Sequence, residues 1–404
     1  MKHFTIGLLF ILISLGCSAQ KQYKQLRSYI KSGSDLDKAL QLVDTCRADS
    51  ALCDDPELYN LAAQVEKKRY EAQNTKLYLK QSYDTTTFFS AIYGIFQNSM
   101  LWDEKECIPD SKGRVHPRSR SKIRRELTKH YANLFAGGLH YLKKQNWTEA
   151  HKFFALYLSL DTIPIFAPDS LNITDPRRPR AAFHALRCSF ESEDFAAVPQ
   201  YAALAEKDTA NLSFSLQYQA IAARRLGKTD EMAAVLHRGV ELVPDNHYFF
   251  SNLIDYYNSL PDYETSLALC RAQIEADSTI MLYHFAEGVV LFSLRDWDGC
   301  VEAMQTVQQN DTSFAEADFY IASCYYNRAC EIEEGIDPEL SAQEFMEKRT
   351  QVQQLYAQAM PFMEAYRCSC PTDKERWATP LYKIYLALNE AEKFREIEAL
   401  IGDN

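Results

Sequence analysis

The sequence lacks the local signatures of common catalytic sites. Its 404 residues contain no H-E-x-x-H, no G-x-S-x-G, no phosphate-binding glycine loop and no dinucleotide fingerprint. The cysteines and histidines are not spaced as a zinc ligand set. Histidines fall in helical stretches, where surface or partly packed roles fit them better than catalysis: His130, His140, His151, His184, His237, His247 and His284. We therefore expect no enzymatic activity, no cofactor and no bound metal.

Two structural patterns are also absent. No stretch alternates apolar and polar residues with period two over the length of a strand, so a β-sheet is not expected. Beyond the N-terminal segment, no apolar run is long enough to cross a membrane. Together these absences predict an all-α chain.

Positive charge is in deficit over the chain as a whole. Asp and Glu number 55 against 44 Lys and Arg, and the net charge of -11 argues against nucleic-acid binding. One segment is an exception, and we name its residues the basic patch: Arg118, Arg120, Lys122, Arg124 and Arg125. The patch is either a solvated loop and exposed helical turn, or a docking surface for an anionic lipid, glycan or protein.

Cysteine is present, but its positions mostly favour free thiols. Cys188, Cys270, Cys300 and Cys324 lie at or beside expected helix-core positions, where cysteine acts as a small apolar residue. Cys368 and Cys370 are too close for an easy bond. Cys46 and Cys53 could link a helix end to the next loop, which would contribute about 2 kcal/mol if a disulfide formed.

The first residues are typical of an export signal, for which we take residues 1–19. Lys2 and His3 precede an apolar run from Phe4 to Leu15 that is too short to span a bilayer. Cleavage before Cys17 would produce a lipoprotein, whereas cleavage after Ala19 would release a soluble protein. We expect an exported, periplasmic protein whose only membrane attachment is a candidate lipid anchor at Cys17.

A spacing of 34 residues recurs along the chain and indicates the fold. Ala220, Ile254, Gly288 and Ala322 are successive steps of it. The same step links two further series: Met232, Ser266 and Cys300; and Leu236, Cys270 and Met304. This is the period of the tetratricopeptide repeat (TPR), in which a small residue on one helix lets its partner helix approach. The pattern predicts a right-handed superhelical solenoid of helical hairpins.

The looser spacing elsewhere predicts the domain organisation. We expect degenerate helical hairpins over residues 20–110 and the TPR solenoid over residues 111–404. A proline-rich stretch predicts a loop over residues 163–178. The chain after Ala322 is longer than one repeat unit before the register resumes. This excess predicts an extended hairpin over residues 329–358, with Asp337 and Pro338 capping its return helix.

Several runs resemble exported TPR proteins of gut Bacteroidales. They are Tyr131 to Phe154, with Asn133, Leu134, Gly137, Gly138, Ala150 and Phe153; Tyr356 to Glu364; and Trp377 to Tyr385. The resemblance covers most of the mature chain and implies a non-enzymatic scaffold. It also implies O-glycosylation at Asp-Ser or Asp-Thr signals: Ser50, Thr85, Thr162, Ser170, Thr209 and Ser278. The alternative is that these residues are ordinary turn and cap residues.

A solenoid of this kind presents a long inner wall made by its first helices, which favours binding over chemistry. The register assigns that wall to Arg224, Arg225, Tyr248, Asp255, Asn258, Phe285, Phe292, Phe319, Tyr326 and Asn327. Aromatic groups beside amide and charged groups suit a peptide segment or a sugar. The sequence therefore predicts a scaffold that binds a protein or peptide partner; the alternative is an envelope protein that binds or processes glycans.

Overall fold

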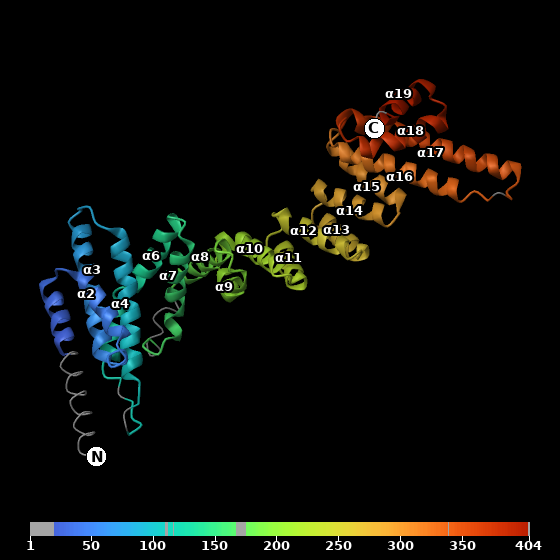
Figure 1. Ribbon diagram of the computed structural model, residues 1–404. Coiled ribbons are helices and arrows are strands. Elements are labelled where there is room, and N and C mark those ends of the chain that lie inside the picture. The colour runs from blue at the N-terminus through green and yellow to red at the C-terminus, as the bar shows by residue number, and fades with distance from the viewer. Residues whose placement is uncertain (1–19, 110–111, 116, 167–174, 338, 403–404) are drawn as a thin grey trace, which may run out of the picture. The chain divides into compact units, whose positions relative to one another are not determined.

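The computed structural model describes residues 20–109, 112–115, 117–166, 175–337 and 339–402. Across these residues every regular element is an α-helix or a short 3₁₀ turn, which confirms the all-α prediction (Figure 1). None of the helices described there is long and apolar enough to cross a membrane. The chain divides into two compact units, Met1–Val243 and Pro244–Asn404.

The first unit begins with five helices. They are a helix over residues 20–32, α2 (Leu36–Ala48), α3 (Pro56–Tyr78), α4 (Thr85–Glu106) and α5 (Arg120–Thr128). Pro56 occupies the first turn of α3, where its missing N–H costs nothing, and Asp55 caps that helix by accepting from the Glu57 N–H. The long antiparallel pair α3 and α4 buries Leu58, Ile92 and Phe96 between its helices and neighbours.

The cysteines of this region are free. Cys46 is fully buried on α2, and Cys53 donates its thiol to the carbonyl of Ser50 at 3.7 Å. The candidate disulfide between them is therefore not formed in this structure. The four cysteines expected in helix cores are buried free thiols: Cys188, Cys270, Cys300 and Cys324.

The rest of the first unit consists of shorter helix pairs. They are α6 (Tyr131–Lys143) with α7 (Trp147–Ser159), α8 (Arg178–Glu191) with α9 (Val198–Ala205), and α10 (Leu212–Arg225) with α11 (Thr229–Leu242). The 3₁₀ turns η1 (Leu160–Thr162), η2 (Phe195–Ala197) and η3 (Thr209–Asn211) lie between helices. Residues 167–174 of the expected loop 163–178 lie outside the described residues, and Arg178 is the first residue of α8.

The second unit continues the pattern of antiparallel pairs. Its helices are α12 (His247–Ser259), α13 (Tyr263–Ala276), α14 (Met281–Ser293), α15 (Trp297–Asn310), α16 (Ala315–Glu334), α17 (Ala342–Ser369), α18 (Lys374–Leu388) and α19 (Ala391–Gly402). Consecutive helices pack against each other throughout. This stack of hairpins is the expected solenoid architecture.

The 34-residue register marks buried positions, as predicted. On the first helices Ala220, Ile254, Gly288 and Ala322 are buried. On the second helices five of the six assigned residues are buried: Ser266, Cys300, Leu236, Cys270 and Met304. Met232 is the exception and is half-buried.

Glycines in the register allow the helices of a hairpin to approach closely. A Cβ added at Gly288 would lie 2.6 Å from the Met304 Cε, and one added at Gly138 would lie 2.6 Å from the Phe154 ring. Real Cβ atoms essentially never come this close to another heavy atom. The large residue of the second helix therefore occupies the space that a side chain on the first helix would need.

The turns within hairpins share one geometry. A residue in the left-handed conformation stands two positions before the second helix at Gln145, Gly227 and Arg295. The next residue's N–H then bonds to a carbonyl near the end of the first helix: Asn146 to Tyr141, Lys228 to Ala223, and Asp296 to Leu291. This closure satisfies carbonyls that the helix end leaves open.

The extended hairpin is formed by α16 and α17, of 20 and 28 residues against 13 or 14 in α12 to α15. Its distal ends extend past the neighbouring helices of the same unit (Figure 1). The predicted cap at Asp337 and Pro338 is wrong. Ser341 caps α17 in a capping box with Glu344, which satisfies two backbone N–H groups reciprocally. Asp337 instead accepts from the Glu339 N–H, and Pro338 lies outside the described residues.

We expect Gly288→Leu to lower the free energy of unfolding by about 1–3 kcal/mol, because the added side chain would occupy the space between the two helices that Met304 fills. Urea unfolding followed by circular dichroism measures the change. The matched control is Ala268→Leu, which adds the same side chain at an exposed position of α13. Equal stability of both variants would contradict the packing described here.

Candidate functional site

Three predicted wall residues of the second unit meet around one tyrosine. Phe285 and Phe292 on α14 lie with ring centroids 6.0 and 5.2 Å from that of Tyr320, and Phe319 on α16 lies 5.5 Å from it. All four rings are half-buried. Edge-to-face contacts hold them, at interplanar angles of 74° to 80°. We name these four residues the aromatic cluster.

Sequence reasoning missed Tyr320, the centre of the cluster. Its counterparts one and two repeats earlier are Ala286 and Asn252, so the 34-residue register does not mark the position. Two further aromatic residues border the cluster: Phe314 packs edge-on against Phe285 at 5.2 Å, and Trp297 packs against Phe292 at 5.4 Å. An isolated aromatic residue beside Phe319 was the only available signal.

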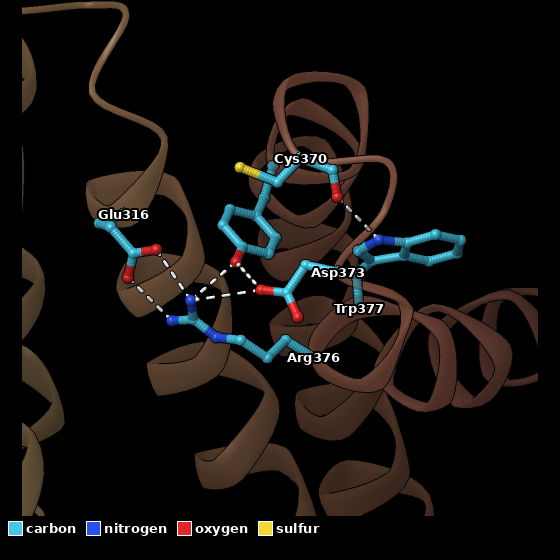
Figure 2. A network of polar contacts seen from close by, with 6 residues as sticks. Glu316, Cys370, Asp373, Arg376 and Trp377 are labelled. Atoms are coloured by element: carbon cyan, nitrogen blue, oxygen red, sulfur yellow. Dashed lines mark hydrogen bonds and ion pairs between the residues drawn. The ribbon is translucent and has the colours of Figure 1, made fainter.

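A polar network, shown in Figure 2, is joined to the cluster through the contact of Arg376 with the Phe319 ring. Arg376 on α18 donates from both terminal nitrogens to the two carboxylate oxygens of Glu316 on α16, each at 2.8 Å. Its guanidinium also lies 3.6 Å from the centroid of the Phe319 ring. Bidentate pairing and stacking use both features of the planar guanidinium, so this arginine ties α18 to the face of α16.

The same network reaches the α17–α18 turn. The Tyr366 hydroxyl donates to Asp373 at 2.5 Å and accepts from Arg376 at 2.7 Å. The Trp377 indole donates to the Cys370 carbonyl at 3.1 Å, as Figure 2 shows. Burial, and then the bond to Asp373, raise the pKa of Tyr366, so its hydroxyl keeps its proton at neutral pH and can act as the donor.

Tyr326, about two turns after Phe319 on α16, belongs to a separate cluster. Its ring lies 5.9 Å from that of Tyr356, and the Lys383 ammonium lies 5.8 Å from its centroid. Lys383 in turn pairs with Glu333 at 2.7 Å. The structure therefore does not bring Tyr326 to the aromatic cluster through any of these contacts.

The remaining predicted wall residues are dispersed. Arg224 and Arg225 are exposed at the end of α10 in the first unit. On α12, Asp255 is exposed, Tyr248 is half-buried, and Asn258 accepts from the Ser266 hydroxyl at 2.9 Å. Asn327 is half-buried on α16. The wall as a single surface stays a prediction.

The basic patch is divided between internal pairing and solvent. Arg120 donates from Nε and Nη2 to Asp103, at 2.9 and 2.8 Å, and therefore anchors α5 to α4. Lys122 lies over the ring of Trp102 at 5.1 Å. Arg118 and Arg125 are exposed, and Arg124 is half-buried on α5.

A cavity of about 710 Å³ in the first unit was not indicated by any motif. Tyr93, His151, Asp161, Arg178 and Tyr201 are among the residues that line it. His151 Nε2 and the Tyr201 hydroxyl are 2.9 Å apart, and Arg178 pairs with Asp161 at 2.7 Å. Burial lowers the pKa of His151, so the ring is neutral at pH 7. Four α-helices and the 3₁₀ turn η1 supply these side chains, which is why the sequence did not reveal them.

The candidate modification sites fall into two groups. Cys17 and Ser170 lie outside the described residues. Within them, Ser50, Thr162, Thr209 and Ser278 are exposed and Thr85 is half-buried. The aspartates beside three of these residues accept backbone N–H groups in turns or caps: Asp49, Asp84 and Asp277. O-glycosylation at the Asp-Ser and Asp-Thr pairs stays a prediction.

No protein-family model matches this chain, and no curated protein does. Similar solved structures include the following three. The C-terminal part of a TPR repeat-containing protein from Cytophaga hutchinsonii is 11% identical, with 65% of this chain and 92% of that chain covered and a TM-score of 0.42. A TPR repeats protein from Bacteroides fragilis is 14% identical, with 67% and 98% covered and a TM-score of 0.33. MamA from Desulfovibrio magneticus is 11% identical, with 46% and 96% covered and a TM-score of 0.31. The fold assignment rests on the helix pairs described above.

We expect Arg376→Ala to destabilise the protein by about 1–2 kcal/mol, because it leaves Glu316 without its bidentate partner and uncovers the Phe319 ring. Arg376→Lys should lose less stability than Arg376→Ala but still fall below the wild type, since an ammonium cannot make the two parallel hydrogen bonds to Glu316. Arg328→Ala, which removes a surface pair with Asp298, is the control and should cost less. Thermal unfolding compares them; the same loss in both alanine variants would contradict a special role for Arg376.

Proposed function

We propose that this protein is a non-enzymatic TPR-type scaffold that binds a peptide segment of a partner protein at the aromatic cluster of its second unit. The observation that carries the proposal is the convergence of Phe285, Phe292 and Phe319 on Tyr320. Successive first helices contribute these rings, and first helices are the elements with which a hairpin solenoid contacts its ligands.

The chemistry of the cluster suits an apolar or aromatic side chain of an extended peptide. Half-buried rings offer large apolar area at a low cost in side-chain entropy, and such residues dominate the energy of interfaces. Beside them, the carboxylate of Glu316 is already held by Arg376 and needs no partner from a ligand. The cluster therefore favours an apolar anchor over a charged one.

Peptide display tests the proposal without knowledge of the natural partner. Random peptides selected on the purified protein should be enriched in aromatic or large aliphatic residues. Their affinity for the double variant Phe285→Ala/Phe292→Ala should fall by at least about tenfold, because central aromatic anchors contribute about 2 kcal/mol or more each. Helicity measured by circular dichroism must remain near that of the wild type.

The control variant for this experiment is Phe345→Ala. Phe345 is 41% exposed on the distal part of α17, away from the cluster, and its removal should leave peptide affinity unchanged. Peptides whose binding survives the double variant would contradict the proposal. Binding of an oligosaccharide instead, abolished by Tyr201→Ala in the cavity of about 710 Å³, would support the glycan-binding alternative.

We further propose that the protein acts outside the cytoplasm, in the periplasm or at the cell envelope. The support is the charged start and short apolar run of residues 1–19, together with the resemblance to exported proteins of Bacteroidales. The intact mass of protein purified from its native cells tests this. We expect loss of the first residues, and the mass distinguishes a lipid at Cys17 from cleavage after Ala19. A full-length mass would contradict export, and added hexose masses would indicate O-glycosylation.

A further inference from the structure

A small cavity lies between three helices of the first unit, beneath part of the basic patch. Its volume is about 160 Å³, and α3, α4 and α5 supply its walls. Four basic residues and one acidic residue line it: Lys67, Lys122, Arg125, Lys129 and Glu126. The lining therefore carries three excess positive charges in a chain whose net charge is -11.

Two of the lysines share one carboxylate partner in the cavity wall. Lys67 and Lys129 both pair with Glu126, at 2.6 and 2.8 Å. Burial by itself would raise the pKa of Glu126, but the hydrogen bonds from Lys129 and Lys67 lower it to about 2. Glu126 is thus ionised at neutral pH and balances about one positive charge of this pair.

Lys122 and Arg125 supply two of the three excess positive charges of the lining. Both side chains are exposed, and they stand three positions apart on α5, on the same face of that helix. The Arg125 guanidinium has the fork of donors that matches an oxyanion. Lys122 lies over the Trp102 ring at 5.1 Å, where its charge is stabilised by the π-system.

The floor of the cavity is apolar with a few hydrogen-bonding groups. Ala63, Ile95 and Ile123 are buried there, and the Trp102 indole is oriented by its bond to Glu106 at 3.0 Å. Asn60 and Gln64 from α3 and Ser99 from α4 also line it. Gln64 donates to Asn60 at 2.9 Å, so these amides are held in place before any ligand arrives.

We propose that this cavity binds a small organic oxyanion, a carboxylate or phosphate ester on a compact body such as one sugar ring. The anion would pair with Lys122 and Arg125, while the organic body would contact Trp102 and the amides of Asn60 and Gln64. A volume of about 160 Å³ holds several water molecules but no polymer chain. The site belongs wholly to the first unit, so its failure would leave the peptide-binding proposal intact.

Calorimetric titration of the full-length chain with four probes tests the site: glucuronate, glucose 6-phosphate, inorganic phosphate and glucose. We expect saturable binding of glucuronate or glucose 6-phosphate, weaker binding of inorganic phosphate and none of glucose. Binding should also change the tryptophan fluorescence, and this signal should disappear in Trp102→Phe. If none of the three anions saturates binding at concentrations up to about 10 mM, the proposal is overturned.

A pair of double variants separates a built site from general attraction of anions. Lys122→Ala/Arg125→Ala should weaken binding at least about tenfold, as expected for loss of charge-assisted hydrogen bonds. Arg114→Ala/Arg118→Ala removes the same charge from exposed positions of the same segment that do not line the cavity, and should leave affinity within about twofold. Equal losses in both would mean that an adventitious ion is attracted by the segment as a whole, which rejects the site. Lys122→Gln/Arg125→Lys loses the guanidinium but keeps one positive charge. Its affinity for the anion should lie between those of the wild type and the double alanine variant.

Discussion

The close approach of two helices within each hairpin is the contact on which the rest of the structure depends. It requires a residue with little or no side chain on the first helix and a large residue on the second, as Gly138 and Phe154 or Gly288 and Met304 show. Because one hairpin cannot bury all its apolar surface, it packs against the next, and the requirement recurs with the same period. The first helices are thereby held in register, and their outward residues form a surface that the core does not use.

The use of that surface differs along the second unit. On α14 and the first turns of α16, aromatic rings converge on Tyr320 and keep part of their area exposed. From α18, Arg376 contacts the Phe319 ring of this cluster and Lys383 contacts the ring of Tyr326, while the same two cations pair with Glu316 and Glu333. The last hairpin thus serves the repeat before it as a cap, which satisfies charge and limits the exposed apolar area.

The first unit differs in that its long pair α3 and α4 carries charged and polar residues close to the core. Glu66 is buried beside Gly94 and paired with Arg69, and Asp103 is buried and paired with Arg120. Such pairs avoid the cost of an isolated buried charge. Lys122 and Arg125, two and five residues after Arg120 on α5, line the cavity. The same helix therefore supplies both a structural anchor and the cations of the proposed oxyanion site.

The sequence by itself determined the all-helical class, the hairpin repeat and the buried positions, because each depends on spacing along one or two adjacent helices. The wrongly predicted cap of α17 also depended on local sequence, because two cap signals stand close together there. Ser341 is the N-cap in the structure, and its S-x-x-E pattern satisfies two backbone N–H groups. The tertiary structure alone decided which wall residues gather, since Arg376 reaches Glu316 across 60 residues and Tyr320 lies outside the repeat register. It also decided that Lys122, Lys67 and Trp102 share a cavity. Contacts between residues far apart in the chain have no period, and they follow only once the helices are packed.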